Sequence, residues 1–324
     1  MSSTLHQLSK FFGKLAGNRP PDEVPLPEDP QPTPEAVVIE APTDGPPTIP
    51  GHQLLRFIGH GAYGEVWLAR DEIGAFHAVK IVHKKTFADR GPFEREYRGI
   101  LQYTPISRTH HALVHILNVG RDNAAGYFFY VMELADCVYS GRNIMPETYC
   151  ARTLAHDLDT RGRLSVRECL NVGLELTEGL RFLHGKQLVH RDIKPANIIF
   201  VNGVAKLADA GLVTHVAEAK RDVKDLGTHG FVPPEGPGTI SADVYSLGKV
   251  LCEASVGPAA TQAASLASLD EAEQDALLQL NEVLFKACHE ELASRYQSVD
   301  EMQADLMQLN DRLGGWAQDS QPHR

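Results

Sequence analysis

Residues 188–200 read LVHRDIKPANIIF. Two apolar residues lead into a polar turn, and an apolar stretch that predicts a strand follows it. Asp192 in the turn is a candidate general base for a hydroxyl group. Lys194 is suited to steady a transferred phosphoryl group, and Asn197 offers a neutral oxygen to a metal ion. A surface turn with incidental charges rarely collects all three, so this stretch predicts phosphoryl-transfer chemistry.

A second stretch, LADAGLV at residues 207–213, places Asp209 in an apolar run. A buried carboxylate is costly unless it is paired or bound to a cation. Asp209 follows a second predicted strand, so a hairpin would bring it beside Asn197. Mg²⁺ is often bound by only one or two carboxylates together with other oxygen ligands. We therefore expect Asp209 to pair with a metal ion and not with another side chain.

Upstream, residues 59–66 read GHGAYGEV, a glycine pattern between two predicted strands. Glycines let the backbone approach a phosphate, whose oxygens the N–H groups can bind. An NAD site needs a helix after the glycines, so this context disfavours one. Lys80 in the next strand would face the same cleft and neutralise phosphate charge. Its anionic partner is predicted to be Glu96 on a short helix, rather than Glu94 on another helical face.

Taken together, the motifs resemble the eukaryotic-type (Hanks-type) Ser/Thr protein kinase family, in its bacterial branch. The resemblance covers about residues 53–311. It implies an α+β, bilobal protein kinase fold with a small β-rich N-lobe (about 51–134) and a larger, mostly helical C-lobe (about 135–313). It also implies ATP and Mg²⁺ as cofactors, with Mn²⁺ as an alternative metal, and proteins with Ser or Thr as substrates.

The resemblance assigns roles to individual positions. The catalytic residues would be Asp192, Lys194, Lys80 and Glu96. The ATP site would comprise Ile58, Gly59, Gly61, Gly64, Val66, Ala78, Lys80, Met132, Glu133, Ala135 and Ile199. The metal would be held by Asn197 and Asp209. Structural and activation-segment positions would be His190, Arg191, Ala210, Gly211, Thr214, Thr228, Glu235, Asp243 and Arg295.

Specific contacts follow from the same resemblance. It predicts an ion pair between Glu235 and Arg295, an anchor from Asp243 to the catalytic loop, and bonds from Thr228 to Asp192 and Lys194. Met132 would be the gatekeeper, and the hinge backbone at Glu133 and Ala135 would bind adenine. Lys194, two residues after Asp192, is the Ser/Thr form of the loop.

The chain departs from the family pattern at Ala210, where phenylalanine is usual. The missing side chain would leave a gap beside His190, worth about 2–4 kcal/mol unless a neighbour fills it. The metal ligand remains, so we expect an active enzyme. The alternatives are a nucleotide-binding pseudokinase scaffold and a small-molecule phosphotransferase of related fold. Residues 137–160 form a longer connection after the hinge than the family needs, and no role for them follows from the sequence.

Regulation is predicted from the segment between Gly211 and Glu235, which has no Ser or Tyr and only two threonines, Thr214 and Thr228. In the family, an arginine placed like Arg191 often binds a phosphorylated loop. Acidic residues are already present at Glu218, Asp222 and Asp225. The hypothesis is that one of these acids replaces a phosphate, so that activity needs no loop phosphorylation.

Composition limits the partners and the compartment. The formal net charge is 31 − 42 = −11, which argues against nucleic acid as the main partner. The five cysteines stand far apart without a CxxC pair, as in a cytoplasmic protein with reduced thiols. No run is long and apolar enough to predict a transmembrane helix, and no secretory signal is visible.

The first 50 residues differ from the rest. Residues 1–19 form a short amphipathic segment, predicted either to dock weakly on a membrane surface or a partner, or to be a frayed helix without a role. Residues 20–50 hold 11 of the 20 prolines and seven acids, which predicts a disordered linker. The kinase domain is expected at 51–313, followed by a tail at 314–324.

Overall fold

The structure is a computed structural model that describes residues 46–61, 64–88, 90–219, 227–228, 230–257 and 269–314. The amphipathic segment 1–19, most of the linker 20–50 and nearly all of the tail 314–324 lie outside the described residues.

The N-terminal lobe is a five-stranded antiparallel sheet in the order β1-β2-β3-β5-β4. Its strands are β1 (His52–Gly61), β2 (Gly64–Asp71), β3 (Phe76–His83), β4 (Ile116–Asp122) and β5 (Tyr127–Met132). The glycine pattern joins β1 to β2, as the sequence predicts. β3 and β5 read FHAVKIVH and YFFYVM, and such β-branched and aromatic runs suit buried central strands.

Helix α2 (Arg90–Ser107) packs beside β4 and follows the short 3₁₀ helix η1 (Lys84–Thr86). It is the helix on which the sequence places Glu96. Phe93, Ile100 and Tyr103 recur at helical spacing and are almost fully buried, which fixes the face that packs on the sheet. The same face carries Glu96 toward the interior.

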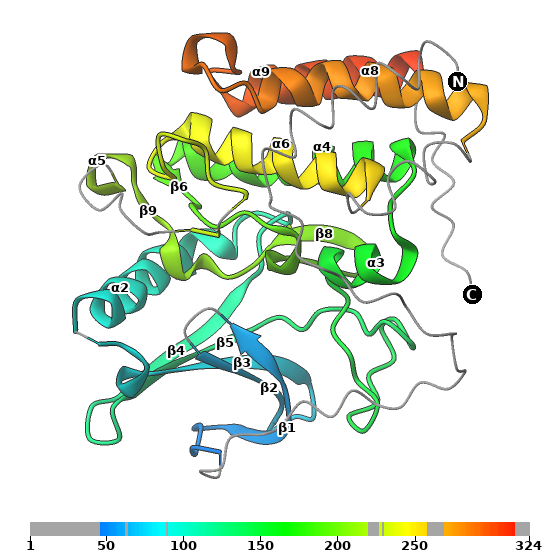
Figure 1. Cartoon of the computed structure of the whole chain (residues 1–324). Helices are drawn as coiled ribbons and strands as arrows, with labels where there is room; N and C mark the ends of the chain where they lie inside the picture. The colour runs from blue at the N-terminus through cyan, green and yellow to red at the C-terminus, as the bar shows by residue number, and fades with distance from the viewer. Residues whose placement is uncertain are drawn as a thin grey trace, which may run out of the picture.

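The C-terminal lobe is mostly helical (Figure 1). Its helices are α3 (Leu154–Arg161), α4 (Val166–Gly185), α5 (Val216–Ala219), α6 (Ile240–Val256), α8 (Glu271–Ala287), η4 (Leu292–Ser294) and α9 (Val299–Arg312). A capping box begins α4, where Ser165 and Glu168 bond each other's backbone N–H groups. α4 packs against α6, α8 and α9, so it is the central helix of this lobe.

Short elements between the lobes shape the cleft. They are β6 (Leu188–Val189), η2 (Pro195–Asn197), β7 (Ile198–Val201), β8 (Val204–Leu207), η3 (Ala210–Leu212) and β9 (Thr214–His215). β7 and β8 form a hairpin in which Ile198 is opposite Leu207, and β6 pairs with β9. These pairings bring the ends of residues 188–200 and 207–213 together.

The residues just before β1 contact the sheet. Ile49 is only 2% exposed, pairs with His52 and packs in a cluster with Phe57 and Trp67 on one face of the sheet. The domain boundary at residue 51 stays a prediction.

The arrangement is the two-lobed α+β architecture that the sequence predicts. The five cysteines are all free thiols. Among the described residues, no helix is both long enough and apolar enough to span a lipid bilayer.

Candidate active site

Three charged side chains from distant parts of the chain meet in the cleft. The ammonium of Lys80 on β3 lies 2.5 Å from Oδ1 of Asp209 and 3.6 Å from Oε1 of Glu96 on α2. Lys80 and Glu96 are each only 2% exposed. Glu94, the alternative partner, instead forms a bidentate pair with Arg121.

Burial and charge shift these groups in different directions. Burial alone would lower the pKa of Lys80, but the carboxylates of Asp209 and Glu96 hold it well above its ordinary value. Burial also opposes ionisation of Asp209, yet Lys80 holds the pKa of that carboxyl below its ordinary value. Burial raises the pKa of Glu96 to about 7, against the pull of Lys80. The ammonium of Lys80 therefore stabilises the ionised form of Asp209 more than the ionised form of Glu96.

The prediction that Asp209 pairs with a metal ion and not with another side chain needs correction. The Lys80 ammonium donates a hydrogen bond to Oδ1 of Asp209 across 129 positions of sequence. A buried carboxylate needs a cation, and the lysine of β3 lies within reach when η3 packs against α2. A carboxylate can accept several bonds, so this ion pair is compatible with metal coordination.

The catalytic-loop carboxylate is held by three neighbours. Thr228 donates from its hydroxyl to Oδ1 of Asp192 at 2.8 Å. Asn197 donates from Nδ2 to Oδ2 of Asp192 and to its backbone carbonyl, both at 2.8 Å. Lys194 lies 3.0 Å from Oδ2 of Asp192 and donates to Thr228 at 2.8 Å. The contacts predicted for Thr228 are present, and they fix the direction of the Asp192 carboxylate.

The loop itself is anchored by Asp243 on α6. This residue is 1% exposed and accepts hydrogen bonds from the backbone N–H groups of His190 and Arg191, and from the ring of His184. Arg191 has φ 75°, a conformation that is unfavourable for a side chain with a Cβ. The two bonds to Asp243 offset that cost, so Asp243 sets the backbone path into Asp192.

Asn197 and Asp209 fit a hard divalent cation. The hairpin places them in adjacent positions, and the backbone N–H of Ala208 donates to the carbonyl of Asn197 at 2.8 Å. Because Asn197 uses its amide nitrogen to bond Asp192, its amide oxygen is the atom that could bind a metal ion. An amide oxygen and a carboxylate are ligands that Mg²⁺ accepts.

The expected adenine-site residues line up along the inner strands and the hinge. Ala78 on β3 is opposite Met132 on β5, and Val66 on β2 is opposite Lys80. Ile58 lies on β1 and Ile199 on β7, both half-buried. A Cβ at Gly61 would lie 2.7 Å from Cε of Lys80, so the backbone at Gly61 lies close to the lysine side chain.

At the hinge, Glu133 is fixed by its own side chain. Its Oε1 accepts from the Nζ of Lys206 at 2.7 Å and from the backbone N–H of His115 at 2.9 Å. The predicted pair between Glu235 and Arg295 is present at 2.5 Å, with Arg295 almost fully buried. It ties the segment after Thr228 to the helical lobe.

Around Ala210, helix α2 lies close to the backbone of η3. A Cβ at Gly99 would lie 2.9 Å from the carbonyl oxygen of Val213 and 3.1 Å from that of Gly211. A Cβ at Gly211 would in turn meet the side chain of Glu96 at 2.8 Å. The helix therefore lies directly on the backbone of η3, and Ala210 is only 3% exposed.

Sequence reasoning did not identify Gly99, Lys206 or Tyr130. Tyr130 is opposite Lys80 in the sheet, is fully enclosed, and its ring centroid lies 5.8 Å from the lysine nitrogen. No motif marks these positions, because their roles depend on contacts between distant segments.

A cavity of about 310 Å³ lies between α2 and the segment that follows Gly211. Its lining includes Arg95 and Arg98 of α2, Arg191 of the catalytic loop, and Glu218. Thr214 also borders it and donates from its hydroxyl to Oε2 of Glu218 at 3.3 Å. Asp222 and Asp225 lie outside the described residues.

A family model described as "Protein kinase domain" matches residues 52–313. The chain is 28% identical over 275 residues to the serine/threonine-protein kinase PrkC of Bacillus subtilis, across 79% of this chain and 40% of PrkC. It is 28% identical over 292 residues to PknB of Mycobacterium tuberculosis, across 81% of this chain and 44% of PknB. The matches therefore span less than half the length of these curated relatives.

The crystal structure of the Mycobacterium tuberculosis PknI kinase domain has the same fold. It superposes with a TM-score of 0.56 at 20% identity, across 81% of this chain and 97% of that domain. The likeness supports the two-lobed architecture described above.

Replacement of Gly99 tests the contact between α2 and η3. Gly99→Ala should lower the free energy of unfolding by about 1–3 kcal/mol, because the added methyl meets backbone oxygens that cannot turn aside. Gly185→Ala, at the end of α4 with nothing within 4 Å, is the matched control and should be neutral or slightly stabilising. Urea unfolding measures both. Equal stability of Gly99→Ala and the wild type would contradict the packing described.

The raised pKa of Glu96 gives a pH dependence with a defined sign. Its carboxyl titrates at about 7 in the folded state against a usual 4.5, so the folded state holds a proton that the unfolded state has lost. The contribution of Glu96 to stability should therefore fall as pH rises from about 4.5 to about 7, and level off above. Urea unfolding over this range, without nucleotide or metal, should show the slope in the wild type.

The matched variants separate this effect from other titrations. Glu96→Gln should remove that part of the slope. Glu94→Gln should retain it, because the pKa of Glu94 is lowered by its pair with Arg121. A slope unchanged in Glu96→Gln would contradict the assignment.

Proposed function

The chain belongs to the protein kinase family, and from that premise we propose that it is an active Ser/Thr protein kinase that transfers the γ-phosphoryl group of ATP to protein hydroxyls. The observation that carries the proposal is the set of bonds that directs the carboxylate of Asp192 beside the Lys80–Asp209 pair. Lys194 also helps to lower the pKa of Asp209, so the two clusters share one electrostatic environment.

In this proposal Asp192 orients the substrate hydroxyl and accepts its proton. Asn197 and Thr228 bond one carboxylate oxygen each, which holds the carboxylate in one direction toward the cleft. The hydroxyl oxygen then forms the new bond to the γ-phosphorus, while the bond to the β-phosphate oxygen breaks. Lys194, which contacts both Asp192 and Thr228, would balance negative charge on the transferred group.

On the nucleotide side, Lys80 would bind phosphate oxygens and Glu96 would keep it in place. Gly61 lies close to Lys80, and the glycine run would cover the phosphates. Met132, Glu133 and Ala135 would contact adenine. Mg²⁺, held by Asn197 and Asp209, would neutralise charge on the phosphates, and Mn²⁺ has the same ligand preference for oxygen.

The proposed substrates are proteins. The ion pair between Glu235 and Arg295 fixes the segment after Thr228, where a peptide would lie beside Asp192. The net charge of −11 disfavours nucleic acid as a partner. The free cysteines support a cytoplasmic location, and the segment 1–19 remains our candidate for weak docking to a membrane surface or a partner.

We further propose that Glu218 supplies the negative charge that a phosphorylated loop would otherwise provide. It borders the cavity that Arg95, Arg98 and Arg191 also line. The hydroxyl of Thr214 donates to Glu218, which fits an unmodified threonine. Attraction between this carboxylate and the arginines would hold α2, the catalytic loop and the following segment together.

Phosphoryl transfer tests the main proposal directly. With labelled ATP and Mg²⁺, the wild type should label itself or a generic basic protein. Asp192→Asn and Asp209→Ala should each lower transfer by about 100-fold or more, because each removes a group needed in the transition state. Asp300→Asn, an exposed carboxylate at the start of α9, is the control and should behave as the wild type. ATP binding by the wild type without transfer to any protein would favour the scaffold instead.

The role of Glu218 has its own test. Wild-type protein treated with a phosphatase should keep its activity, and Glu218→Gln should lower kcat several-fold. Glu282→Gln, an exposed position on α8, is the matched control and should leave kcat unchanged. Loss of activity on phosphatase treatment, with a phosphate mapped to Thr214, would overturn the idea.

A further inference from the structure

Residues 137–151 form a compact loop between the hinge and the helical lobe, which we call the strap. It includes most of the irregular part of the connection that the sequence left without a role, since residues 154–160 belong to α3. In Figure 1 this green loop lies below α3 and to the side of the N-terminal sheet. Its contacts join the two lobes at a point outside the hinge.

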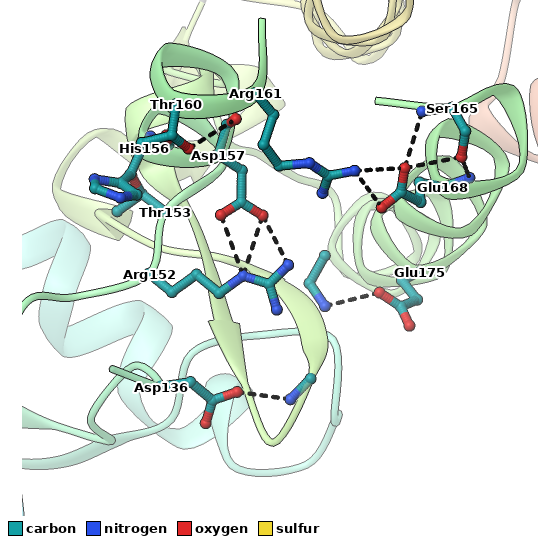
Figure 2. A network of polar contacts seen from close by, with 12 residues as sticks. Asp136, Arg152, Thr153, His156, Asp157, Thr160, Arg161, Ser165, Glu168 and Glu175 are labelled. Atoms are coloured by element: carbon teal, nitrogen blue, oxygen red, sulfur yellow. Dashed lines mark hydrogen bonds and ion pairs between the residues drawn. The ribbon is translucent and has the colours of Figure 1, made fainter. Parts of the chain in front are cut away.

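The base of the strap is fixed to the helical lobe. The N–H of Val138 donates to the carbonyl of Cys150, and Arg152 donates from its N–H to the carbonyl of Asp136. The Asp136 carboxylate accepts from the backbone at the turn of the β7–β8 hairpin (Figure 2). The guanidinium of Arg152 donates hydrogen bonds to the carboxylate of Asp157 on α3 (Figure 2). Its carbon also lies 4.2 Å from the centroid of the Phe200 ring.

The far end of the strap contacts the sheet of the N-terminal lobe. Nη1 of Arg56 on β1 donates to the carbonyl of Glu147 at 2.8 Å, and more weakly to those of Tyr149 at 3.3 Å and Pro146 at 3.4 Å. A guanidinium that meets several carbonyls holds a loop in one orientation.

Apolar contacts surround these bonds. Cys137 and Tyr149 of the strap are each 2% exposed and pack with Leu68 of β2. Half-buried side chains around this cluster include those of Leu55, Ile58, Phe76 and Ile144. Opening the lobes at this edge would separate this apolar surface and expose it to water.

The strap also contacts the nucleotide site. The hydroxyl of Tyr149 donates to the carbonyl of Ala135 at 3.0 Å, a hinge position expected to lie beside adenine. Ile58, expected over the adenine ring, packs against the strap. Two elements that would hold the base are therefore positioned by residues 137–151.

We propose that the strap is a positioning element of the nucleotide site, in which Arg56 and Tyr149 resist opening of the cleft and so slow the release of nucleotide. This inference rests on the proposed nucleotide site. It adds that residues outside the family motifs influence how fast nucleotide leaves that site. Arg56 would act by holding the N-terminal lobe against the strap. Tyr149 would act by holding the hinge backbone at Ala135. Neither touches the reacting atoms.

Dissociation of a fluorescent ADP analogue with Mg²⁺, followed by stopped flow, tests the proposal on the full chain. Arg56→Met should release the analogue about fivefold faster or more than the wild type, because the link between the lobes is lost while the aliphatic contacts remain. Tyr149→Phe keeps the ring and removes only the hydroxyl, and should release it about two- to threefold faster. Arg142→Met, an exposed arginine of the same loop, should match the wild type.

A second measurement excludes a general loss of structure. Phosphoryl transfer in a single turnover at saturating ATP should stay within about twofold in both variants, because Asp192 is held by other contacts. Release of the analogue at the wild-type rate by both Arg56→Met and Tyr149→Phe would contradict the proposed role of the strap. Faster release accompanied by an equal loss of single-turnover transfer would overturn it as well. A wild type that binds no analogue would overturn the nucleotide site itself, and with it the strap.

Discussion

The site depends on one ammonium group placed between two enclosed carboxylates. Lys80 comes from the sheet, Glu96 from α2 and Asp209 from the start of η3, so three separately folded elements must meet at one cation. A single positive charge cannot fully compensate two carboxylates in a medium that screens poorly. Asp209 forms the shorter contact with Lys80. Glu96 is less well compensated, and its pKa is raised. The position of α2 relative to the cleft is therefore linked to the charge on this cluster.

Much of this arrangement can be predicted from the sequence, because many decisive contacts are local or belong to ordered motifs. Asp192 and Asn197 are five residues apart, and their bond follows from the turn between them. The two-lobed fold follows from strand-like and helical patterns in succession. The partner of Asp209 could not be predicted so directly, since it lies 129 residues away and depends on how the lobes meet. Sequence patterns give residue types, but they do not give distances across a cleft.

Small residues show a second limit of sequence reasoning. The deficit expected at Ala210 assumes a backbone that stays in place when a side chain is absent. Here the backbone of η3 and the helix at Gly99 lie in close contact, which residue types alone do not reveal. The strap was hard to predict for a related reason. Arg56 bonds backbone carbonyls, which every residue has, so no residue type in the strap reveals the contact.

Asp243 has a consequence for how the molecule can respond to other proteins. Because it fixes the backbone at His190 and Arg191, the position of the proposed base, Asp192, follows α6 and the helical lobe. Lys80 instead moves with the sheet, and Glu96 with α2. Each half of the site can remain internally intact while the halves separate. A molecule that binds the sheet lobe more tightly in one relative position of the halves would therefore alter the population of conformers in which the halves face each other, and leave the geometry within each half unchanged.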